Sequence, residues 1–281
     1  MMNRSEGFSL VELAVALAII ALLIAGALIP LSTQMDVRNV ADTRRTMESI
    51  REAIVGFAQA NGRLPCPADG TVPAGGTDAF GLAAGTAQYN VAGFPNQCAS
   101  NAGTVPWATL GVPEVDGWGR RFSYWVSPIF ADALPTPNPA TFSSPGQTPA
   151  CNPTPLPTQS SFALCSQGIF TANTRNEGSH ALTAVGLQLP ALIVSHGKNG
   201  FGAYTPTGVT LAAPTGADEI ANANHASTAT TFVSRISTPN PSPLGCNDNS
   251  GASAFCEFDD IVVMIASNVL IARMVAAGRL P

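Results

Sequence analysis

The chain has 281 residues and a formal net charge of −5, and only 11% of its residues are charged. With 13 basic side chains against 18 acidic ones, it lacks the clustered Lys and Arg that neutralise phosphates, which excludes a nucleic-acid-binding protein. The 46% hydrophobic content excludes a disordered chain, and the composition also excludes a coiled-coil rod and a collagen-like chain.

The N-terminal region predicts a segment that crosses a membrane. A polar stretch, 1–7, precedes an apolar run over 8–31 whose one charged side chain belongs to Glu12. At about 1.5 Å per residue, a helix of this length is long enough for the hydrocarbon core of a bilayer. We therefore predict a transmembrane helix over this run.

The same helix is predicted to continue beyond the apolar run. Over 32–61, apolar residues recur at helical spacing while charged residues occupy the other faces, which is typical of an amphipathic helix. Asn61 and Gly62 form a common helix end. The pattern predicts one helix from Phe8 to Ala60, spanning in its first half and amphipathic in its second.

A short motif precedes the apolar run. The string Gly7-Phe8-Ser9-Leu10-Val11-Glu12-Leu13 resembles the type III signal of type IV pilins and type II secretion pseudopilins. The resemblance implies that a prepilin peptidase cleaves after Gly7 and methylates the new N-terminal residue, Phe8. It also places Glu12 at the fifth mature position, where that family has a hallmark glutamate.

Glu12 is costly in a membrane, which favours a functional role. A carboxylate in a spanning helix costs about 2.5–3.5 kcal/mol on insertion scales. In a bundle of such helices, Glu12 can pair with the α-amino group of Phe8 in an adjacent subunit and set the axial register. The alternative is a carboxylate that is simply tolerated near the membrane surface.

Two other interpretations of the N-terminus stay open. One is a plain membrane anchor. The other is a secretory signal peptide cleaved after Ala25-Gly26-Ala27, so that the mature chain starts at Leu28. The signal peptide would make the protein a secreted, disulfide-stapled binding protein or enzyme.

The remainder, 62–281, is predicted to form one α+β head domain. The segment 116–126 reads as a turn and a strand, and it resembles the hairpin entry of pseudopilins, with Gly117 where that family usually has Pro. Trp118 is expected to be a core aromatic between the sheet and the long helix. A Pro-, Ser- and Thr-rich stretch, 131–160, reads as a long loop.

Further elements are predicted toward the C-terminus. Strands are expected over 163–170, 191–195, 230–236 and 261–266, the last as a buried central strand. A short helix is expected after Ser267. The predicted fold class is thus α+β and pilin-like, with a long N-terminal helix packed on an antiparallel β-sheet with long, disulfide-stapled loops.

Six cysteines lie beyond residue 60, which suits an oxidising compartment for the head domain. No C-x-x-C motif occurs, which argues against zinc sites and thioredoxin-like chemistry. Six cysteines allow 15 pairings, and free buried thiols are the alternative. The sequential pairing closes short loops; it joins Cys66 to Cys98, Cys151 to Cys165 and Cys246 to Cys256.

A possible calcium site is implied by a second resemblance. The segments 195–203 and 216–222 resemble the calcium-binding C-terminal loop of the major pseudopilin, although Lys198 lies inside the loop and the intervening segment is longer. Calcium binds six to eight oxygens, and the alternative is a solvated turn. The possible ligands carried over by position are Asn199, Asp218, Glu219 and Asn222.

The other polar residues predict no catalytic chemistry. Ser195, His196 and Asp259 are the residue types of a catalytic triad. However, Ser195 and His196 are adjacent, so on a strand their side chains would point to opposite faces, and no G-x-S-x-G motif occurs. Asp259 and Asp260 are interpreted as a turn that enters a strand, and His180 and His225 as surface loop residues.

The resemblance implies a minor pilin or pseudopilin, not an enzyme, in a type IV pilus or type II secretion-type fibre. Its expected partners are the prepilin peptidase, other pilin or pseudopilin subunits, the inner-membrane assembly platform and membrane lipid, with no nucleic acid. The expected location is the bacterial inner membrane, as a single-pass protein with a periplasmic C-terminal domain, and then the fibre at the cell surface. The sequence does not separate secretion from adhesion, motility or DNA uptake.

Overall fold

The computed structural model describes residues 9–93, 97–132, 151–239 and 245–280, without the side chains of 23–33. The predicted leader, 1–7, and the predicted cleavage and methylation residues Gly7 and Phe8 lie outside the described residues, as does most of the predicted loop 131–160.

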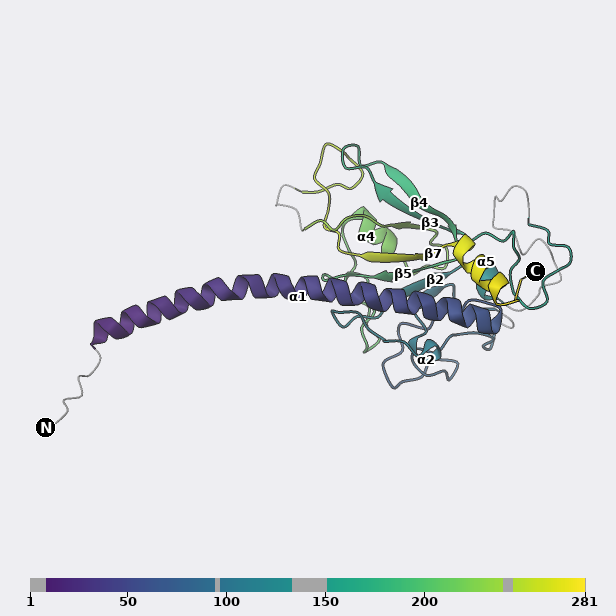
Figure 1. Ribbon diagram of the computed structural model, residues 1–281, viewed down its shortest axis with the longest axis horizontal. Helices are drawn as coiled ribbons and strands as arrows, with labels where there is room; N and C mark the ends of the chain where they lie inside the picture. Colours follow the sequence, from purple (N-terminus) through teal and green to yellow (C-terminus); the bar gives the residue numbers. More distant parts are fainter. Residues whose placement is uncertain (1–8, 94–96, 133–150, 240–244, 281) are drawn as a thin grey trace.

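One long helix dominates the shape of the molecule. Helix α1 (Leu10–Asn61) has 52 residues, which corresponds to about 78 Å, and its backbone is helical through Gly26 and Pro30. It starts two residues later than predicted because Ser9 is its N-cap. It ends at Asn61, and the next residue, Gly62, caps it in the left-handed conformation with a φ of 72°. The N-terminal half projects away from the head, and the C-terminal half packs along it (Figure 1).

The first sheet packs on the C-terminal half of α1. Its strand order is β1 (Ala102–Thr104), β2 (Ser123–Val126), β5 (Ala191–Ser195) and β7 (Ile261–Ile265), all antiparallel. Apolar side chains from α1 and from one face of this sheet form the larger buried core. They include Met47, Ile50, Ile54, Phe122, Tyr124, Val126 and Ile193.

A second sheet covers the other face of the first. Its order is β4 (Leu182–Leu189), β3 (Phe170–Arg175) and β6 (Thr231–Val233), with β3 and β6 parallel. A second core fills the space between the sheets; it includes Trp125, Phe170, Leu192, Val194 and Phe232. The head therefore has three layers, and the prediction of one antiparallel sheet was incomplete.

Four predictions about the head were wrong in detail. The segment 163–169 has no strand, and the strand begins at Phe170. Among the residues that the structure describes, β7 pairs with β5 alone and is an edge strand, and its run is apolar because it faces a core on each side. The buried core aromatic is Trp125, whereas Trp118 is partly exposed. His180 is 5% exposed and stacks on Phe255, so it is not a surface residue.

Short helices complete the head. α2 (Trp107–Leu110) and α3 (Pro128–Ala131) flank β2, and α4 (Ala217–Asn222) precedes β6. The predicted C-terminal helix is present as α5 (Ser267–Ala276), and it packs against α1. Arg279, just beyond α5, donates hydrogen bonds to the Gln59 and Ala60 carbonyls, so the C-terminal segment satisfies backbone groups at the end of α1.

All six cysteines are paired, in the sequential pattern. The disulfides are Cys66–Cys98, Cys151–Cys165 and Cys246–Cys256. They close loops that carry little regular structure.

The described part of the chain, which omits the side chains of 23–33, contains no helix long and apolar enough to cross a membrane. The predicted span, 8–31, falls partly within the omitted residues.

Candidate functional sites

The N-terminus of α1 is organised around Glu12. The Glu12 carboxylate accepts a hydrogen bond from the Ser9 amide at 3.0 Å, and the Ser9 hydroxyl accepts one from the Glu12 amide at 3.3 Å. This reciprocal pair is a capping box. The carboxylate is exposed on the helix, so it is accessible to a partner.

The helix that follows exposes apolar side chains on every face. Leu10, Val11, Leu13, Val15, Leu17, Ile19, Ile20 and Leu22 are each more than half exposed. An exposed apolar surface of this extent marks a contact with lipid or with other protein chains.

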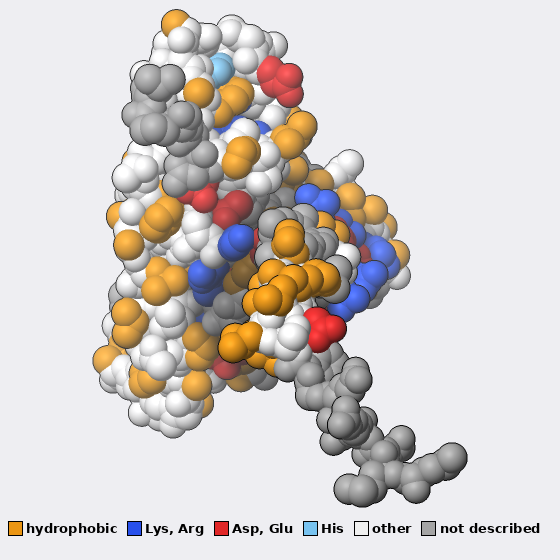
Figure 2. Space-filling view, turned by 90° about the vertical axis from the view of Figure 1, so that its left-hand side faces the viewer, with side chains coloured by type: hydrophobic (Ala, Val, Ile, Leu, Met, Phe, Trp, Pro, Cys, Tyr) orange, Lys and Arg blue, Asp and Glu red, His pale blue; other side chains and the backbone are white. Residues whose placement is uncertain are grey.

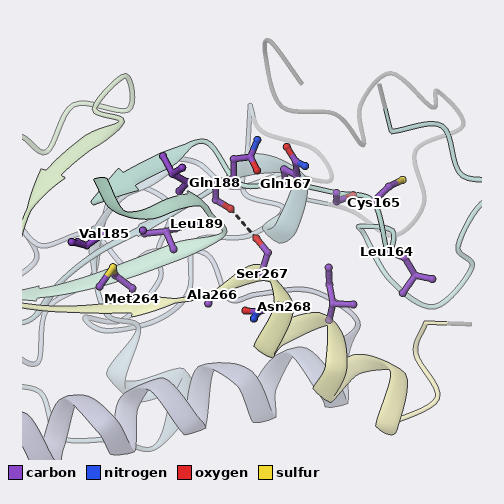
Figure 3. Close-up of a pocket in the computed structure, with 14 residues that line it drawn as sticks. Leu164, Cys165, Gln167, Val185, Gln188, Leu189, Met264, Ala266, Ser267 and Asn268 are labelled. Atoms are coloured by element: carbon purple, nitrogen blue, oxygen red, sulfur yellow. Dashed lines mark hydrogen bonds between the residues drawn. The ribbon is translucent and has the colours of Figure 1, made fainter. Parts of the chain in front are cut away.

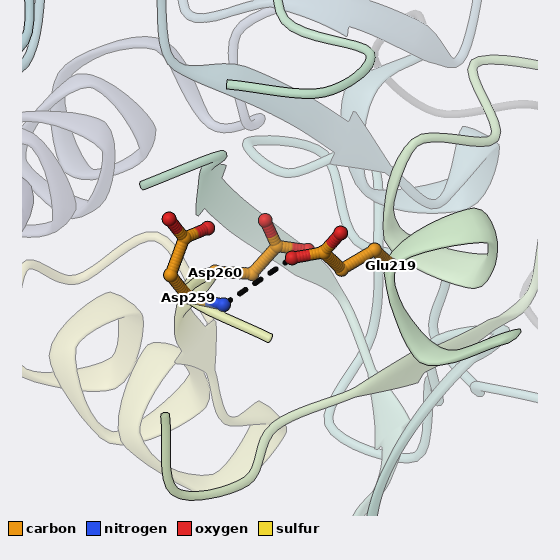
Figure 4. A group of neighbouring side chains, drawn as sticks. All are labelled: Glu219, Asp259 and Asp260. Carbon is orange, nitrogen blue, oxygen red and sulfur yellow. Dashed lines mark hydrogen bonds between the residues drawn. The ribbon is translucent and has the colours of Figure 1, made fainter. Parts of the chain in front are cut away.

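An acidic cluster lies in the head, between α4 and the start of β7. One carboxylate oxygen each from Glu219, Asp259 and Asp260 lies within 4.8 Å of the others (Figure 4). The Asp259 amide donates to Glu219 Oε1 at 3.3 Å, and Asn199 Nδ2 donates to the same oxygen at 2.8 Å. The cluster thus joins three segments that are far apart in the sequence.

Burial raises the pKa of two carboxyl groups in this cluster, Glu219 and Asp259. Desolvation, followed by the nearby charge of Asp260, raises the pKa of Glu219 to about 8. Burial likewise raises the pKa of Asp259 to about 6, against the effect of the hydrogen bond from the Asn199 amide. The cluster therefore holds fewer negative charges than its residues suggest, and a cation among them would favour the ionised forms.

Asp218 occupies a different environment from the one expected for a calcium ligand. Its two carboxylate oxygens accept hydrogen bonds from Arg175 Nε and Arg235 Nε, each at 2.6 Å. Arg235 also pairs with Asp248 at 3.2 Å, and all four side chains are at most 5% exposed. This buried ion network holds β3, α4 and the segment after β6 together.

Asn222 is also occupied by protein groups. Its Oδ1 accepts a hydrogen bond from the Val233 amide, and its Nδ2 donates to the Val233 carbonyl and to Asp260, each at 2.8 Å. Of the four expected ligands, Glu219 alone belongs to the acidic cluster, and Asn199 contacts it.

The carboxylates that folding brings together therefore differ from the expected ligand set. Arginine and backbone groups use the oxygens of Asp218 and Asn222. In the acidic cluster, Asp259 Oδ1 is buried without a hydrogen-bond partner in the described part of the chain. Asp259 and Asp260 directly precede β7, as expected, but they form no turn, and the sequence did not indicate that folding brings α4 to them.

A Ser–His–Asp alignment also occurs around His196, with a different serine and a different aspartate from those named in the sequence analysis. Ser195 donates to Asp116 at 2.7 Å, whereas His196 Nε2 lies 2.9 Å from Ser123 Oγ and its Nδ1 lies 3.7 Å from Asp260 Oδ1. Ser123 and His196 are at most 1% exposed. A substrate cannot reach this serine without opening the two sheets, so the arrangement acts as a buried polar contact.

A groove of about 810 Å³ lies between β4 and α5. Figure 3 shows its lining, which includes Val185, Leu189 and Met264, and the hydrogen bond of 2.8 Å from Ser267 Oγ to the Gln188 carbonyl. The described residues that line it include no charged side chain.

Comparison with known proteins bears on the N-terminus alone. Residues 2–28 match the family model of the prokaryotic N-terminal methylation motif. No curated protein and no solved structure matches the chain significantly. Proteins with this motif are usually structural rather than enzymatic. The chain thus carries, at its N-terminus, the methylation motif that is the signal of type IV pilins and pseudopilins.

Proposed function

We propose that the protein is a minor pilin or pseudopilin, a structural subunit of a type IV pilus or a type II secretion-type fibre. A prepilin peptidase cleaves the precursor between Gly7 and Phe8 and methylates Phe8. The subunit is inserted in the inner membrane with its head in the periplasm. It is then assembled into the fibre by contacts of its N-terminal helix. It has no enzymatic activity.

The observation that carries this proposal is the combination of the motif at 2–28 with the shape of α1. The motif lies at the start of a 52-residue helix whose N-terminal half projects from the head and exposes apolar side chains (Figure 1). Such a surface is stable only when lipid or neighbouring helices cover it. A fibre subunit has lipid around this helix before assembly and neighbouring helices around it after assembly.

The carboxylate of Glu12 is proposed to select the register of assembly. On leaving the membrane, it pairs with the methylated α-amino group of Phe8 in a neighbouring subunit. A charge pair between apolar helices is strongly favoured over two separate buried charges, so it fixes the axial position of the incoming helix.

Mass spectrometry of the mature N-terminus tests the proposal. The chain is purified from membranes and from sheared surface fibres of the native host, and its N-terminal peptide is sequenced. N-methyl-Phe8 is the expected result. A mature chain that begins at Leu28 would contradict it and support the secreted, disulfide-stapled protein instead.

We also propose that the acidic cluster binds calcium. Glu219, Asp259 and Asp260 would hold the ion, with Asn199 beside it, because their oxygens converge and calcium prefers oxygen ligands. Calcium is expected to raise the melting temperature of the chelator-treated full chain, and Asp259→Asn is expected to remove this effect. An identical melting curve with and without calcium would remove the proposal.

A further inference from the structure

The outer edge of β7 opens into a groove. In the described part of the chain, β7 pairs with β5 on one side and with no strand on the other. The groove has a volume of about 1020 Å³, and Ile261, Val262 and Val263 form part of its lining. An unpaired strand edge presents backbone donors and acceptors that another extended chain can use.

Two walls flank this strand edge. Val40, Arg44 and Glu48 of α1 form one wall, and the segment 234–239 forms the other. Figure 2, which looks at the molecule from the N-terminal end of α1, shows the hollow between this helix and the head, with charged side chains in it. An added strand would therefore lie between walls that its side chains could contact, which is how strand addition gains specificity.

The chain already pairs an extended segment with the residues just before β7. The Thr238 amide donates to the Phe258 carbonyl at 2.8 Å, and the Phe258 amide donates to the Thr238 carbonyl at 3.0 Å. This bridge is isolated and does not continue along β7. The chain's own segment thus occupies the edge at Phe258, and the edge without a strand partner in the described part of the chain is that of β7 itself.

The charge of the groove selects the chemistry of its partner. Five acidic and three basic side chains line it. Among the basic ones, Lys198 pairs with Asp36 at 2.7 Å, and Arg235 pairs with buried Asp218 and Asp248. Arg44 is the remaining basic residue, against Glu257, Asp259 and the buried Asp260, and the charges of Glu257 and Asp259 also act on Lys198. The lining keeps an excess of negative charge, which attracts positive charge.

We propose that this groove binds an extended, basic segment of another protein as an added strand along β7, with Lys or Arg side chains that reach past the Thr238–Phe258 bridge to Asp259 and Glu257. A second copy of this chain is a poorer match, because it has a net charge of −5 and one lysine. The proposal goes beyond the role of a fibre subunit, which rests on α1.

Peptide binding to the full chain in detergent micelles tests the proposal. The probes are fluorescein-labelled peptides that alternate valine with lysine or valine with glutamate, and fluorescence anisotropy gives the affinity. Chelator-treated buffer keeps metal ions away from Asp259. The lysine peptide is expected to bind at least about tenfold more tightly than the glutamate peptide. Equal affinities would overturn the proposed charge selection.

Backbone methylation separates strand addition from simple charge attraction. One edge of an added strand faces β7, so N-methylation of one alternate set of amides in the lysine peptide should lower affinity about tenfold or more. Methylation of the other set should leave it unchanged. If neither set affects binding, the peptide does not add to the sheet and the proposal fails.

A protein variant locates the contact. Glu257→Gln should lower the affinity for the lysine peptide by about threefold, because it removes one partly exposed charge contact. Glu177→Gln, an exposed change outside the groove, is the matched control and should have no effect. Equal affinities for both variants and the wild type would place the binding elsewhere. A chain dimer that the peptide dissociates would make a second copy the occupant and overturn the assignment to another protein.

Discussion

Glu12 and Ser9 bond to each other in both directions at the start of α1: the Glu12 carboxylate accepts from the Ser9 amide at 3.0 Å, and the Ser9 hydroxyl accepts from the Glu12 amide at 3.3 Å. The carboxylate that we propose pairs with a neighbouring Phe8 is therefore already held in the first turn of the helix. During assembly, the Glu12 carboxylate then exchanges the Ser9 amide for the α-amino group of Phe8, and its side chain does not have to be ordered from a free state.

This pair makes two substitutions informative. Glu12→Gln keeps a side chain that can complete the capping box but removes the charge, whereas Glu12→Ala removes both. If the charge sets the register, both variants should enter the membrane normally and both should be absent from sheared fibres, as measured by immunoblotting of each fraction. Wild-type incorporation of Glu12→Gln would instead assign the role of Glu12 to helix capping.

The ion network around Asp218 is expected to dominate the response of the head to mutation. Arg235→Ala leaves the buried Asp218 and Asp248 carboxylates with one fewer positive partner, which should lower the free energy of unfolding by about 3–5 kcal/mol. Arg45→Ala, which removes an exposed pair with Asp42, should cost less than about 1 kcal/mol. Urea unfolding followed by tryptophan fluorescence measures both, and equal costs would contradict the assigned role of the network.

The acidic cluster predicts a pH dependence in calcium-free buffer. Burial raises the pKa of Glu219 from 4.5 to about 8, so between these values the folded chain keeps a proton that the unfolded chain has lost. The resulting stabilisation is complete below pH 4.5 and disappears as the pH rises through about 8. The melting temperature should therefore fall over this range, and Glu219→Gln should make the fall shallower; an unchanged slope would argue against the shift.

Calcium should reverse this dependence if it binds the cluster. The ion requires ionised carboxylates, so the stabilisation that it gives should increase as Asp259 and Glu219 lose their protons. Melting curves at several pH values, with and without calcium, measure the difference. Stabilisation that is independent of pH would place calcium at another site.

The three disulfides should differ in their contributions to stability. The loop closed by Cys66–Cys98 has a sequence separation of 32, against 10 for Cys246–Cys256. Loop-closure entropy gives about 4 kcal/mol for the first and about 3 kcal/mol for the second. Paired Cys→Ser variants, compared by urea unfolding, should follow this order; a larger loss for the shorter loop would show that local contacts outweigh chain entropy.

The second sheet shows where prediction from the sequence failed. Phe170–Arg175 and Leu182–Leu189 carry no clear alternation, since β3 faces the inter-sheet core while β4 is largely exposed on both faces. The register shifts between these strands further disturb the period of two. These strands therefore form because they pair with segments that are distant in sequence, and a local residue pattern does not predict such pairing.

The sequence by itself determined local features: the motif before the apolar run, the period of α1, its end before Gly62 and the short spacings between successive cysteines. Each depends on residues that are close along the chain. The structure decided which cysteines pair. Only the tertiary structure decided that Asp218 meets Arg175 and Arg235, that Glu219 meets Asp259 and Asp260, and that β7 has an open edge. The reason is that burial and charge pairing depend on which distant segments fold together.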